Sequence, residues 1–438
     1  MRIRRLSLQL LPPIAVILCW TGWAARTPAA ESDDTPREPA PPASAFGQSV
    51  DGISDEDLPY IYTHWKNYTV KDGLPNDHIF SVKATAEAIW IGTEDGLARL
   101  DKKTGAIQSW KEADGLPWRA ITAIDVDPKT GDVWLGLFGG GLARFSGGRF
   151  DHFHQLNSGL VNDVVYGVAV ENNHVWCATT AGASRYDILA GKWDVFTEKN
   201  APMEEIWNYN VTYAPAVNKM FLAVWGSGCL EFDIPTEKWK VYLDPDKEME
   251  IDLYRDDGII HVITTAASYA DGALWVSTYF GTCRYDGRHW RGFYAHETGI
   301  PSDFTNFLKG RSADEAWLCT DKGLGVVAHY PTDTYVAYYR NADDPGGTAK
   351  IFRRGRLLRE VPLEVSVAHN FMIGVDFDGD DVWLATAHGL SHGIGKGYYP
   401  GVKKISEWQQ AVEAAPAQSK DSPWAVDFDS RRPRHATR

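Results

Sequence analysis

Aromatic and hydrogen-bonding residues recur together at the ends of short apolar runs in this chain. One set stands just before such runs and comprises Asn76, Asp77, His78, Trp118, Arg119, Asn162, Asp163, Trp207, Asn208, Tyr209, Ser302 and Asp303. A second set stands just after such runs and comprises Phe138, Trp225, Tyr279, Phe280, Asp321, Lys322 and His388. An aromatic face can stack on a sugar ring, while Asp, Asn and Arg offer acceptors and donors to its hydroxyls. The mixture is also typical of protein-binding hot spots, so a glycan and a partner protein both remain open as ligands.

Three tryptophans are the strongest candidates for ligand contact. Trp118, Trp207 and Trp225 occupy positions for which the repeat of the chain provides no buried place, and large aromatics left in water usually serve contacts. The acidic and amide residues have a structural alternative as turn caps, which we expect to cover more than half of these positions. The predicted ligand-binding set is Asp77, His78, Trp118, Arg119, Asn162, Asp163, Trp207, Tyr209, Trp225, Tyr279, Asp303 and His388.

The sequence gives less support to catalysis or metal binding. It contains thirteen histidines, and none of them falls in a known catalytic phrase. His369, His388 and His392 fall within the last copy of the repeat described below, and His78 begins the neighbouring copy. A metal or general-base role for these four is the alternative to surface or hydrogen-bonded histidines. The cysteines show neither a CxxC pair nor metal-ligand spacing. We therefore predict no catalytic residue, metal or cofactor. A polysaccharide lyase or hydrolase is the rival hypothesis, and a protein-interaction scaffold is a further one.

A sevenfold repeat must position these residues. Each copy is an aromatic anchor followed by an aliphatic residue, a small residue and usually Thr. The anchors are Trp90, Trp134, Trp176, Phe221, Trp275, Trp317 and Trp383, which lie 44, 42, 45, 54, 42 and 66 residues apart by subtraction. A period in the low forties carried by short β-type runs is typical of β-propeller blades. Alternation along a strand buries the aliphatic residues on one face and the anchors on the other.

A second motif, aromatic-x-x-aromatic, follows most anchors by about sixteen residues. The copies are Phe150/Phe153, Trp193/Phe196, Trp239/Tyr242, Trp290/Phe293 and Tyr335/Tyr338, with Ile107/Trp110 as a degenerate copy. No copy follows Trp383, whereas one precedes the first anchor as Trp65/Tyr68. This offset predicts a seven-bladed, all-β propeller whose ring is closed by an N-terminal strand, which removes the exposed sheet edges.

The repeat also predicts the blades. Blade 1 should use strands 79–85, 88–94, 96–101 and 106–111, and the other blades should begin near 121, 164, 209, 259, 304 and 371. The longer spacings indicate insertions near 243–258 and 341–369. The second insertion carries a basic group comprising Lys350, Arg353, Arg354, Arg356 and Arg359.

The two ends of the chain differ from the repeat in composition and lack its motifs. Basic residues, an apolar run and a small-residue stretch predict a signal peptide over 1–30, cleaved near Ala29 or Ala30 or kept as an anchor. A flexible linker over 31–59, the propeller over 60–400 and a tail over 401–438 should follow. Apart from the first run, no stretch could span a membrane. The net charge of −14 argues against nucleic acid and anionic membrane surfaces as partners, and we expect a monomer.

Four cysteines remain after the predicted signal peptide. Cys177 and Cys319 fall in the apolar and small-residue positions of the repeat, so both should be buried. Cys229 and Cys283 belong to adjacent blades but differ by one position in the repeat, so they should face opposite ways. We therefore predict four buried free thiols.

The segment 68–79 followed by 89–101 resembles the two-component-regulator propeller repeat. The phrases Asp72-Gly73-Leu74 and Trp90-Ile91-Gly92-Thr93 carry the resemblance, which covers roughly residues 60–395. In that family such propellers form the extracytoplasmic sensor part of hybrid histidine kinases. No kinase or DNA-binding region follows the last blade, so signalling in cis is not expected. The resemblance implies a periplasmic or secreted, sensor-like propeller that binds a ligand or partner at its loop-rich face and is not an enzyme.

Overall fold

The computed structural model describes residues 58–244 and 258–395. The predicted signal peptide, almost all of the linker, most of the first insertion and the C-terminal tail lie outside these residues. None of the helices in the described part of the chain is long and apolar enough to cross a membrane.

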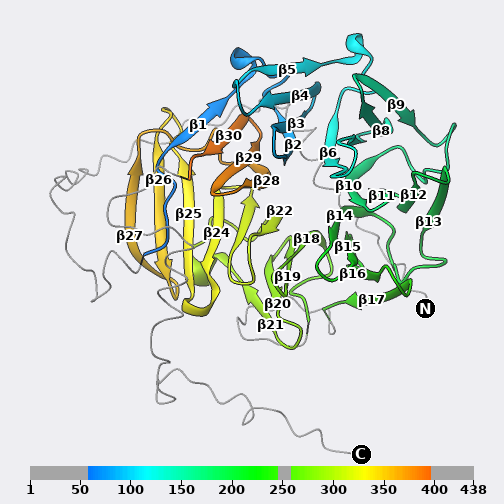
Figure 1. The fold of residues 1–438 in the computed structure, drawn as a ribbon. Helices are drawn as coiled ribbons and strands as arrows, with labels where there is room; N and C mark the ends of the chain where they lie inside the picture. Colours follow the sequence, from blue (N-terminus) through cyan, green and yellow to red (C-terminus); the bar gives the residue numbers. More distant parts are fainter. Residues whose placement is uncertain (1–57, 245–257, 396–438) are drawn as a thin grey trace, which may run out of the picture. The chain divides into compact units, whose positions relative to one another are not determined.

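Seven antiparallel sheets form the blades of a propeller (Figure 1). Blade 1 is β2 (Ile79–Ala84), β3 (Ala88–Thr93), β4 (Gly96–Asp101) and β5 (Ile107–Trp110). Blade 2 is β6 (Ile121–Val126), β7 (Val133–Leu137), β8 (Gly141–Ser146) and β9 (Arg149–Phe153). Blade 3 is β10 (Val165–Glu171), β11 (His174–Thr179), β12 (Gly182–Asp187) and β13 (Lys192–Phe196). Blade 4 is β14 (Asn208–Ala214), β15 (Lys219–Val224), β16 (Gly228–Asp233) and β17 (Lys238–Tyr242).

The remaining blades follow the same plan. Blade 5 is β18 (Thr264–Ala270), β19 (Ala273–Thr278), β20 (Gly281–Tyr285) and β21 (Trp290–Phe293). Blade 6 is β22 (Thr305–Gly310), β23 (Ala316–Thr320), β24 (Leu324–His329), β25 (Thr334–Arg340), β26 (Gly347–Arg353) and β27 (Arg356–Leu363). Blade 7 is β28 (Met372–Asp378), β29 (Asp381–Thr386), β30 (Gly389–Gly393) and β1 (Trp65–Tyr68). One-turn helices occur at Val70–Asp72, Glu112–Asp114, Ala295–Thr298 and Tyr330–Thr332.

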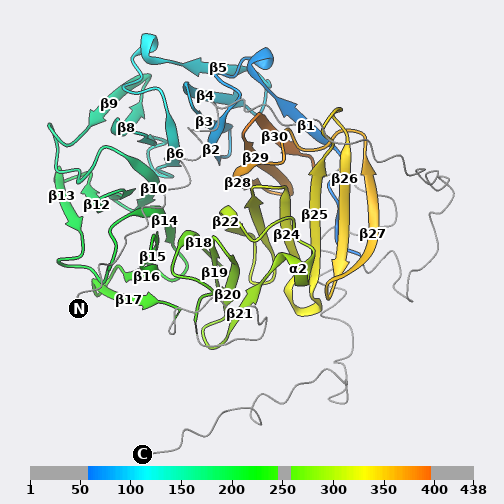
Figure 2. The same cartoon turned by 180° about the vertical axis from the view of Figure 1, so that it is seen from behind.

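The first strand of each blade faces the centre of the ring (Figure 2). Each of these innermost strands contacts the innermost strands of the two neighbouring blades, and β28 returns to β2. Every pairing of a first with a second strand has a register shift at the same place, as between Ile79 and Ser81 in blade 1. Such a bulge increases the local twist of a strand. The repeated bulge therefore gives all seven innermost strands the same bend at the same end.

The predicted closure of the ring is confirmed. β1 pairs antiparallel with β30, placing Trp65 opposite Gly393 and Tyr68 opposite Leu390. The segment before β1 reinforces this closure, because the Tyr62 hydroxyl donates to the Asp380 carbonyl at 2.5 Å. Burial raises the pKa of Tyr62 to about 12, so this donor keeps its proton at neutral pH. The N-terminal segment thus ties the last blade to the body of the ring.

In four blades an Arg on the third strand pairs with the anchor across the sheet. Trp90, Trp134, Trp176 and Trp275 lie opposite Arg99, Arg144, Arg185 and Arg284 in the register of the second and third strands. Each guanidinium lies over the anchor ring, 5.5–6.0 Å from its centroid. In blade 7, His392 replaces Arg and stacks on Trp383 at 3.8 Å. These cation–π and stacking contacts cover one face of the anchor ring in five blades.

One boundary prediction needs correction. The innermost strand of blade 5 begins at Thr264, not near 259, because Ile259 and Ile260 belong to the loop that packs into the core between blades 4 and 5. The predicted insertion at 341–369 contains β26 and β27. These strands extend blade 6 to six strands, and their apolar residues Ile351 and Val361 pack in one core cluster with Leu58 from the N-terminal segment.

The four cysteines in the described residues are buried and free, as predicted. Facing opposite ways does not separate Cys229 from Cys283, however. They belong to neighbouring blades, so opposite faces meet at one interface, and both lie in the core cluster between blades 4 and 5. The Cys283 sulfur accepts a hydrogen bond from the Ile260 backbone N–H at 3.1 Å.

A chain of buried and half-buried charges joins the innermost strands. Asp376 on β28 binds Lys309 on β22 and accepts from the Ala84 backbone N–H on β2 at 2.8 Å. Lys83 on β2 in turn binds Asp125 on β6 at 2.7 Å. Burial opposes both charges, yet the neighbouring lysines lower the pKa of Asp376, and the neighbouring carboxylates raise that of Lys83. The chain of contacts therefore links blades 6, 7, 1 and 2 through ionised groups.

Candidate functional site

One end of the ring gathers the loops that the sequence analysis singled out. The start of each innermost strand lies beside the end of the second strand, as Ile79 beside Thr93. We call this end the mouth. In every blade, the residue after the second strand donates its backbone N–H to a carbonyl just before or at the first strand, as Glu94 to His78 and Trp225 to Trp207. This repeated bond fixes two side chains of each blade at the mouth.

Aromatic side chains occupy one side of the mouth continuously. The aromatic arc consists of Phe138, Tyr166, Trp207, Tyr209, Trp225, Tyr279 and Phe304, from blades 2 to 6. Successive ring centroids lie between 4.4 Å (Tyr279 to Phe304) and 6.4 Å (Trp207 to Trp225) apart. Tyr166 and Tyr209 are buried, and the other five rings are half-buried. The arc therefore has a packed base and a partly exposed upper surface.

Polar atoms lie between the rings of the arc. The Tyr209 hydroxyl faces the Tyr279 hydroxyl, and the Tyr166 hydroxyl faces the Trp207 indole N–H. Burial raises the pKa values of Tyr166, Tyr209 and Tyr279, so all three phenols remain protonated. These groups therefore interact with one another beneath the partly exposed rings of the arc.

Most predicted acidic and amide residues cap the loops of the mouth. Asp77, Asp163 and Asp303 accept backbone N–H groups of Val70, Gln155 and Ala295 at 2.6–2.8 Å. Three others accept the backbone N–H two residues later; these are Asn76, Asn162 and Ser302. These side chains are therefore engaged in shaping the loops, as the structural alternative expected. Asn208 is fully buried and donates to the Ile206 carbonyl.

The three predicted contact tryptophans differ in their surroundings. Trp118 is 40% exposed, and its indole N–H donates to the Phe138 carbonyl at 2.6 Å. Trp207 and Trp225 are half-buried members of the arc, so they are not simply left in water. Arg119 is also exposed, and its nearest carboxylate is Asp95 at 3.6 Å. The structure thus places Trp118 at the periphery of the mouth and the other two within its aromatic side.

Three histidines occupy the opposite side of the mouth. The His78 Nδ1 atom lies 3.3 Å from the Glu94 carboxylate, and the rings of His369 and His388 lie 5.1 Å apart. Burial lowers the pKa values of His78 and His369, and the proximity of His388 lowers them further. Both imidazoles are therefore mostly neutral at pH 7. His392 lies elsewhere, stacked on Trp383 and bonded to Asp381.

Some mouth residues escaped the sequence analysis. Tyr166, Phe304 and Glu94 were not predicted. Each lies at or beside a repeat position that was predicted in another blade. Glu94, for example, is equivalent to Trp225 and Tyr279. Aligning the seven copies at the Thr that ends the second strand would have identified Glu94. Phe280 and Lys322, which were predicted, follow the residues that the repeated bond places at the mouth. Phe280 packs against His261, with the ring centroids 4.5 Å apart.

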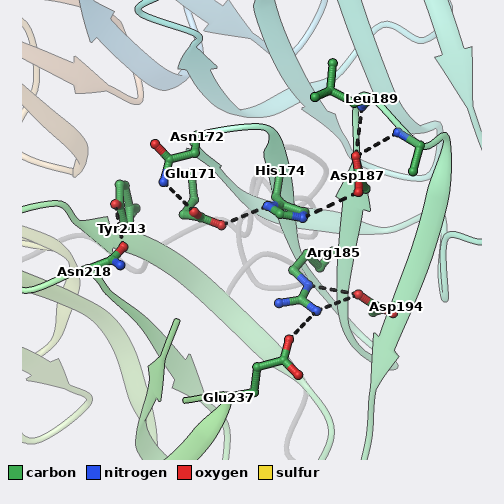
Figure 3. Close-up of polar contacts among 11 residues, drawn as sticks. Glu171, Asn172, His174, Arg185, Asp187, Leu189, Asp194, Tyr213, Asn218 and Glu237 are labelled. Carbon is green, nitrogen blue, oxygen red and sulfur yellow. Dashed lines mark hydrogen bonds and ion pairs between the residues drawn. The ribbon is translucent and has the colours of Figure 1, made fainter. Parts of the chain in front are cut away.

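A second polar cluster lies away from the mouth (Figure 3). His174 lies between Glu171 and Asp187, at 3.2 and 3.9 Å, in the hairpins of blade 3. Arg185 bridges Asp194 of its own blade and Glu237 of blade 4 at 2.7 and 2.9 Å. Nowhere in residues 58–244 and 258–395 do three His, Cys, Asp or Glu side chains gather closely enough to hold a metal ion. The cluster therefore acts as an inter-blade bridge.

Comparisons with known proteins agree with the propeller architecture. No protein-family model matches the sequence, and no curated protein sequence matches it. Among solved structures, the extracellular domain of a hybrid two-component system from B. thetaiotaomicron superposes with a TM-score of 0.55 at 14% identity. The match covers 76% of this chain and 42% of that one. A second such domain gives a TM-score of 0.51 at 16% identity, with coverage of 76% and 40%.

An enzyme of the same architecture is also similar. Virginiamycin B lyase from Staphylococcus aureus superposes with a TM-score of 0.52 at 13% identity, covering 75% of this chain and 97% of the lyase. The chain spans only about two fifths of the length of the two sensor domains. At these identities the similarity concerns the fold alone. What the comparisons and the strand order establish together is a seven-bladed β-propeller of the architecture used by extracellular sensor domains and by a lyase.

Proposed function

We propose that this chain is a secreted or periplasmic, sensor-like propeller that binds a carbohydrate at the mouth through the aromatic arc. The observation that carries the proposal is the unbroken series of seven rings from Phe138 to Phe304, five of them half-buried at the mouth. Sugar rings present C–H faces that stack on aromatics and hydroxyls that supply hydrogen bonds. The arc offers the stacking faces over blades 2 to 6, and the exposed Arg119 and Lys322 are polar groups on loops of blades 2 and 6.

Binding without turnover fits the polar groups better than catalysis does. The carboxylates Asp77, Asp163 and Asp303 are held by backbone N–H groups of their own loops. Glycoside hydrolysis needs two carboxyl groups facing each other about 5–10 Å apart across the scissile bond. The neutral His78, with Glu94 at its Nδ1 atom, is the group that an enzymatic alternative would use as a base.

A glycan array with residues 31–438 tests the proposal, followed by titration of each positive glycan by tryptophan fluorescence. Trp225→Ala should weaken binding by about 1–3 kcal/mol, the range for truncating an aromatic contact residue. The matched control is Leu189→Ala. Leu189 is 79% exposed and lies in the turn between β12 and β13 of blade 3 (Figure 3), at the opposite end of these strands from the mouth. Absence of any bound glycan, or equal binding by the two variants, would contradict the proposal. Release of reducing ends or unsaturated products from a bound glycan would show an enzyme instead.

A further inference from the structure

The aromatic arc ends at a carboxylate. Phe304, its last ring, precedes β22, and the Phe304 carbonyl accepts the backbone N–H of Asp321 at 3.4 Å. Tyr279 packs on Phe304 at 4.4 Å, and Trp225 meets Tyr279 edge-on at 5.5 Å. All four residues are half-buried. Three aromatic rings and one carboxylate therefore form a corner of the mouth between blades 4 and 6.

Asp321 differs from the other half-buried carboxylates of the mouth. Those at Asp77, Asp163 and Asp303 accept backbone N–H groups. Glu94 lies against His78, and Asp95 lies 2.8 Å from the Lys111 ammonium.

The Asp321 Oδ1 atom, in contrast, is buried and has no hydrogen-bond partner in the described residues. The neighbouring Lys322 side chain is exposed and makes no hydrogen bond to this oxygen within the described residues. Loop capping and internal ion pairing therefore do not account for the Asp321 carboxylate.

An organic ammonium group matches the chemistry of this corner. A carboxylate forms short, charge-assisted hydrogen bonds with an ammonium, which replace the hydration that a half-buried oxygen has lost. The faces of Trp, Tyr and Phe attract the same cation through their quadrupoles. A chain with a net charge of −14 also favours the approach of cations over anions.

We propose that the carbohydrate bound at the mouth is an amino sugar whose protonated amine binds at Asp321, flanked by Trp225, Tyr279 and Phe304. This inference rests on the proposed function and adds the charge of the ligand to it. An N-acetylated or neutral sugar would stack on the same rings but would leave the Asp321 carboxylate without a cation. The preference for an amine should therefore be separable from carbohydrate binding itself.

Three oligosaccharides with the same β-1,4-linked backbone test the inference. The probes are tetramers of glucose, N-acetylglucosamine and glucosamine, titrated by calorimetry against residues 31–438 at a pH that keeps the amine protonated. We expect the glucosamine tetramer to bind about tenfold or more tightly than the other two. Raising the salt concentration should reduce that advantage, because a partly exposed charge pair is screened.

Two variants test whether Asp321 causes the preference for the glucosamine tetramer. Asp321→Asn should abolish the preference for the glucosamine tetramer and leave the affinity for the glucose tetramer within about twofold. Asp343→Asn is the matched control, since it makes the same charge change at an exposed position of blade 6 and should keep the preference. Melting temperatures report whether each variant is folded, and the wild-type comparison needs no variant.

The outcomes separate this inference from the proposed function. Equal affinities of the wild-type protein for the three tetramers would overturn the ammonium assignment and leave carbohydrate binding intact. Persistence of the preference in Asp321→Asn would overturn it as well. If none of the tetramers binds, the inference fails, and a blank glycan array would then refute the proposed function too.

Discussion

Replacing Asp376 should destabilise the ring more than most single changes. Its side chain is 7% exposed, binds the Lys309 ammonium and accepts the Ala84 backbone N–H at 2.8 Å. Asp376→Ala removes the partner of a half-buried lysine and the acceptor of a backbone donor in the neighbouring blade. Breaking a fully buried ion pair costs about 3–5 kcal/mol, and the partial exposure of Lys309 places the expected loss at the lower end of this range. Asp376→Asn should cost less, about 2–3 kcal/mol, because an amide oxygen can still accept from Ala84.

Urea unfolding followed by tryptophan fluorescence measures these losses, and a double-mutant cycle with Lys309→Met isolates the pair. Removing both charges should recover part of the loss, giving a coupling energy of about 1–3 kcal/mol between Asp376 and Lys309. The neighbouring lysines lower the pKa of Asp376 despite its burial. Its contribution should therefore be complete above the usual carboxyl pKa of about 4 and should disappear as the pH falls below that value.

A loss below about 1 kcal/mol for Asp376→Ala would refute this reasoning, as would a coupling energy indistinguishable from zero. Either result would mean that solvent in the ring replaces the carboxylate at little cost. The innermost strands would then be held by their backbone and apolar contacts alone.

Three further predictions concern other parts of the ring. Trp176→Ala should destabilise the fold by about 3–5 kcal/mol, because Trp176 is fully buried. Trp118→Ala should change the free energy of unfolding by less than about 1 kcal/mol, and equal losses for the two variants in urea unfolding would contradict this difference. Burial lowers the pKa of His329 to about 4, below its unfolded value of about 6.5. The contribution of neutral His329 to the free energy of unfolding is therefore complete above pH 6.5 and should fall by about 2–3 kcal/mol by pH 4.5. A His329→Gln variant with the same pH dependence of stability as the parent would exclude His329 as the cause. The four described thiols are buried, and burial raises the pKa of each, so Ellman's reagent should modify none of them in the native protein and all of them in urea; rapid labelling of the native protein would show that a blade opens.

The sequence predicted the blades well because each carries the same local pattern. A strand buried on both faces needs an anchor such as Trp90, an apolar neighbour such as Ile91 and a small residue such as Gly92, and these requirements recur wherever a blade packs between two others. The displaced copy at Trp65 and Tyr68 likewise predicted the closing strand, which β1 confirms. Boundaries were less certain where the pattern weakened, as before Thr264, where apolar loop residues resemble the start of a strand.

The candidate site was predicted only in outline. Loop position placed Trp207, Trp225 and Tyr279 at one end of the ring, because antiparallel strands bring the same ends together in every blade. Composition could not distinguish Asp77, which caps a loop, from Asp321, whose buried oxygen has no partner in the described residues. That distinction depends on which backbone N–H groups each carboxylate reaches.

The sequence alone therefore determined the architecture, because the pattern of buried residues is local and each copy of the repeat contains it in full. Only the tertiary structure decided how residues from different blades combine. The contact of Tyr279 with Phe304, the pair of Asp376 with Lys309 and the shared interface of Cys229 and Cys283 all join positions of different blades. The physical reason is that such contacts depend on the rotation from one blade to the next and on the bend of the innermost strands, and no single copy of the repeat encodes either.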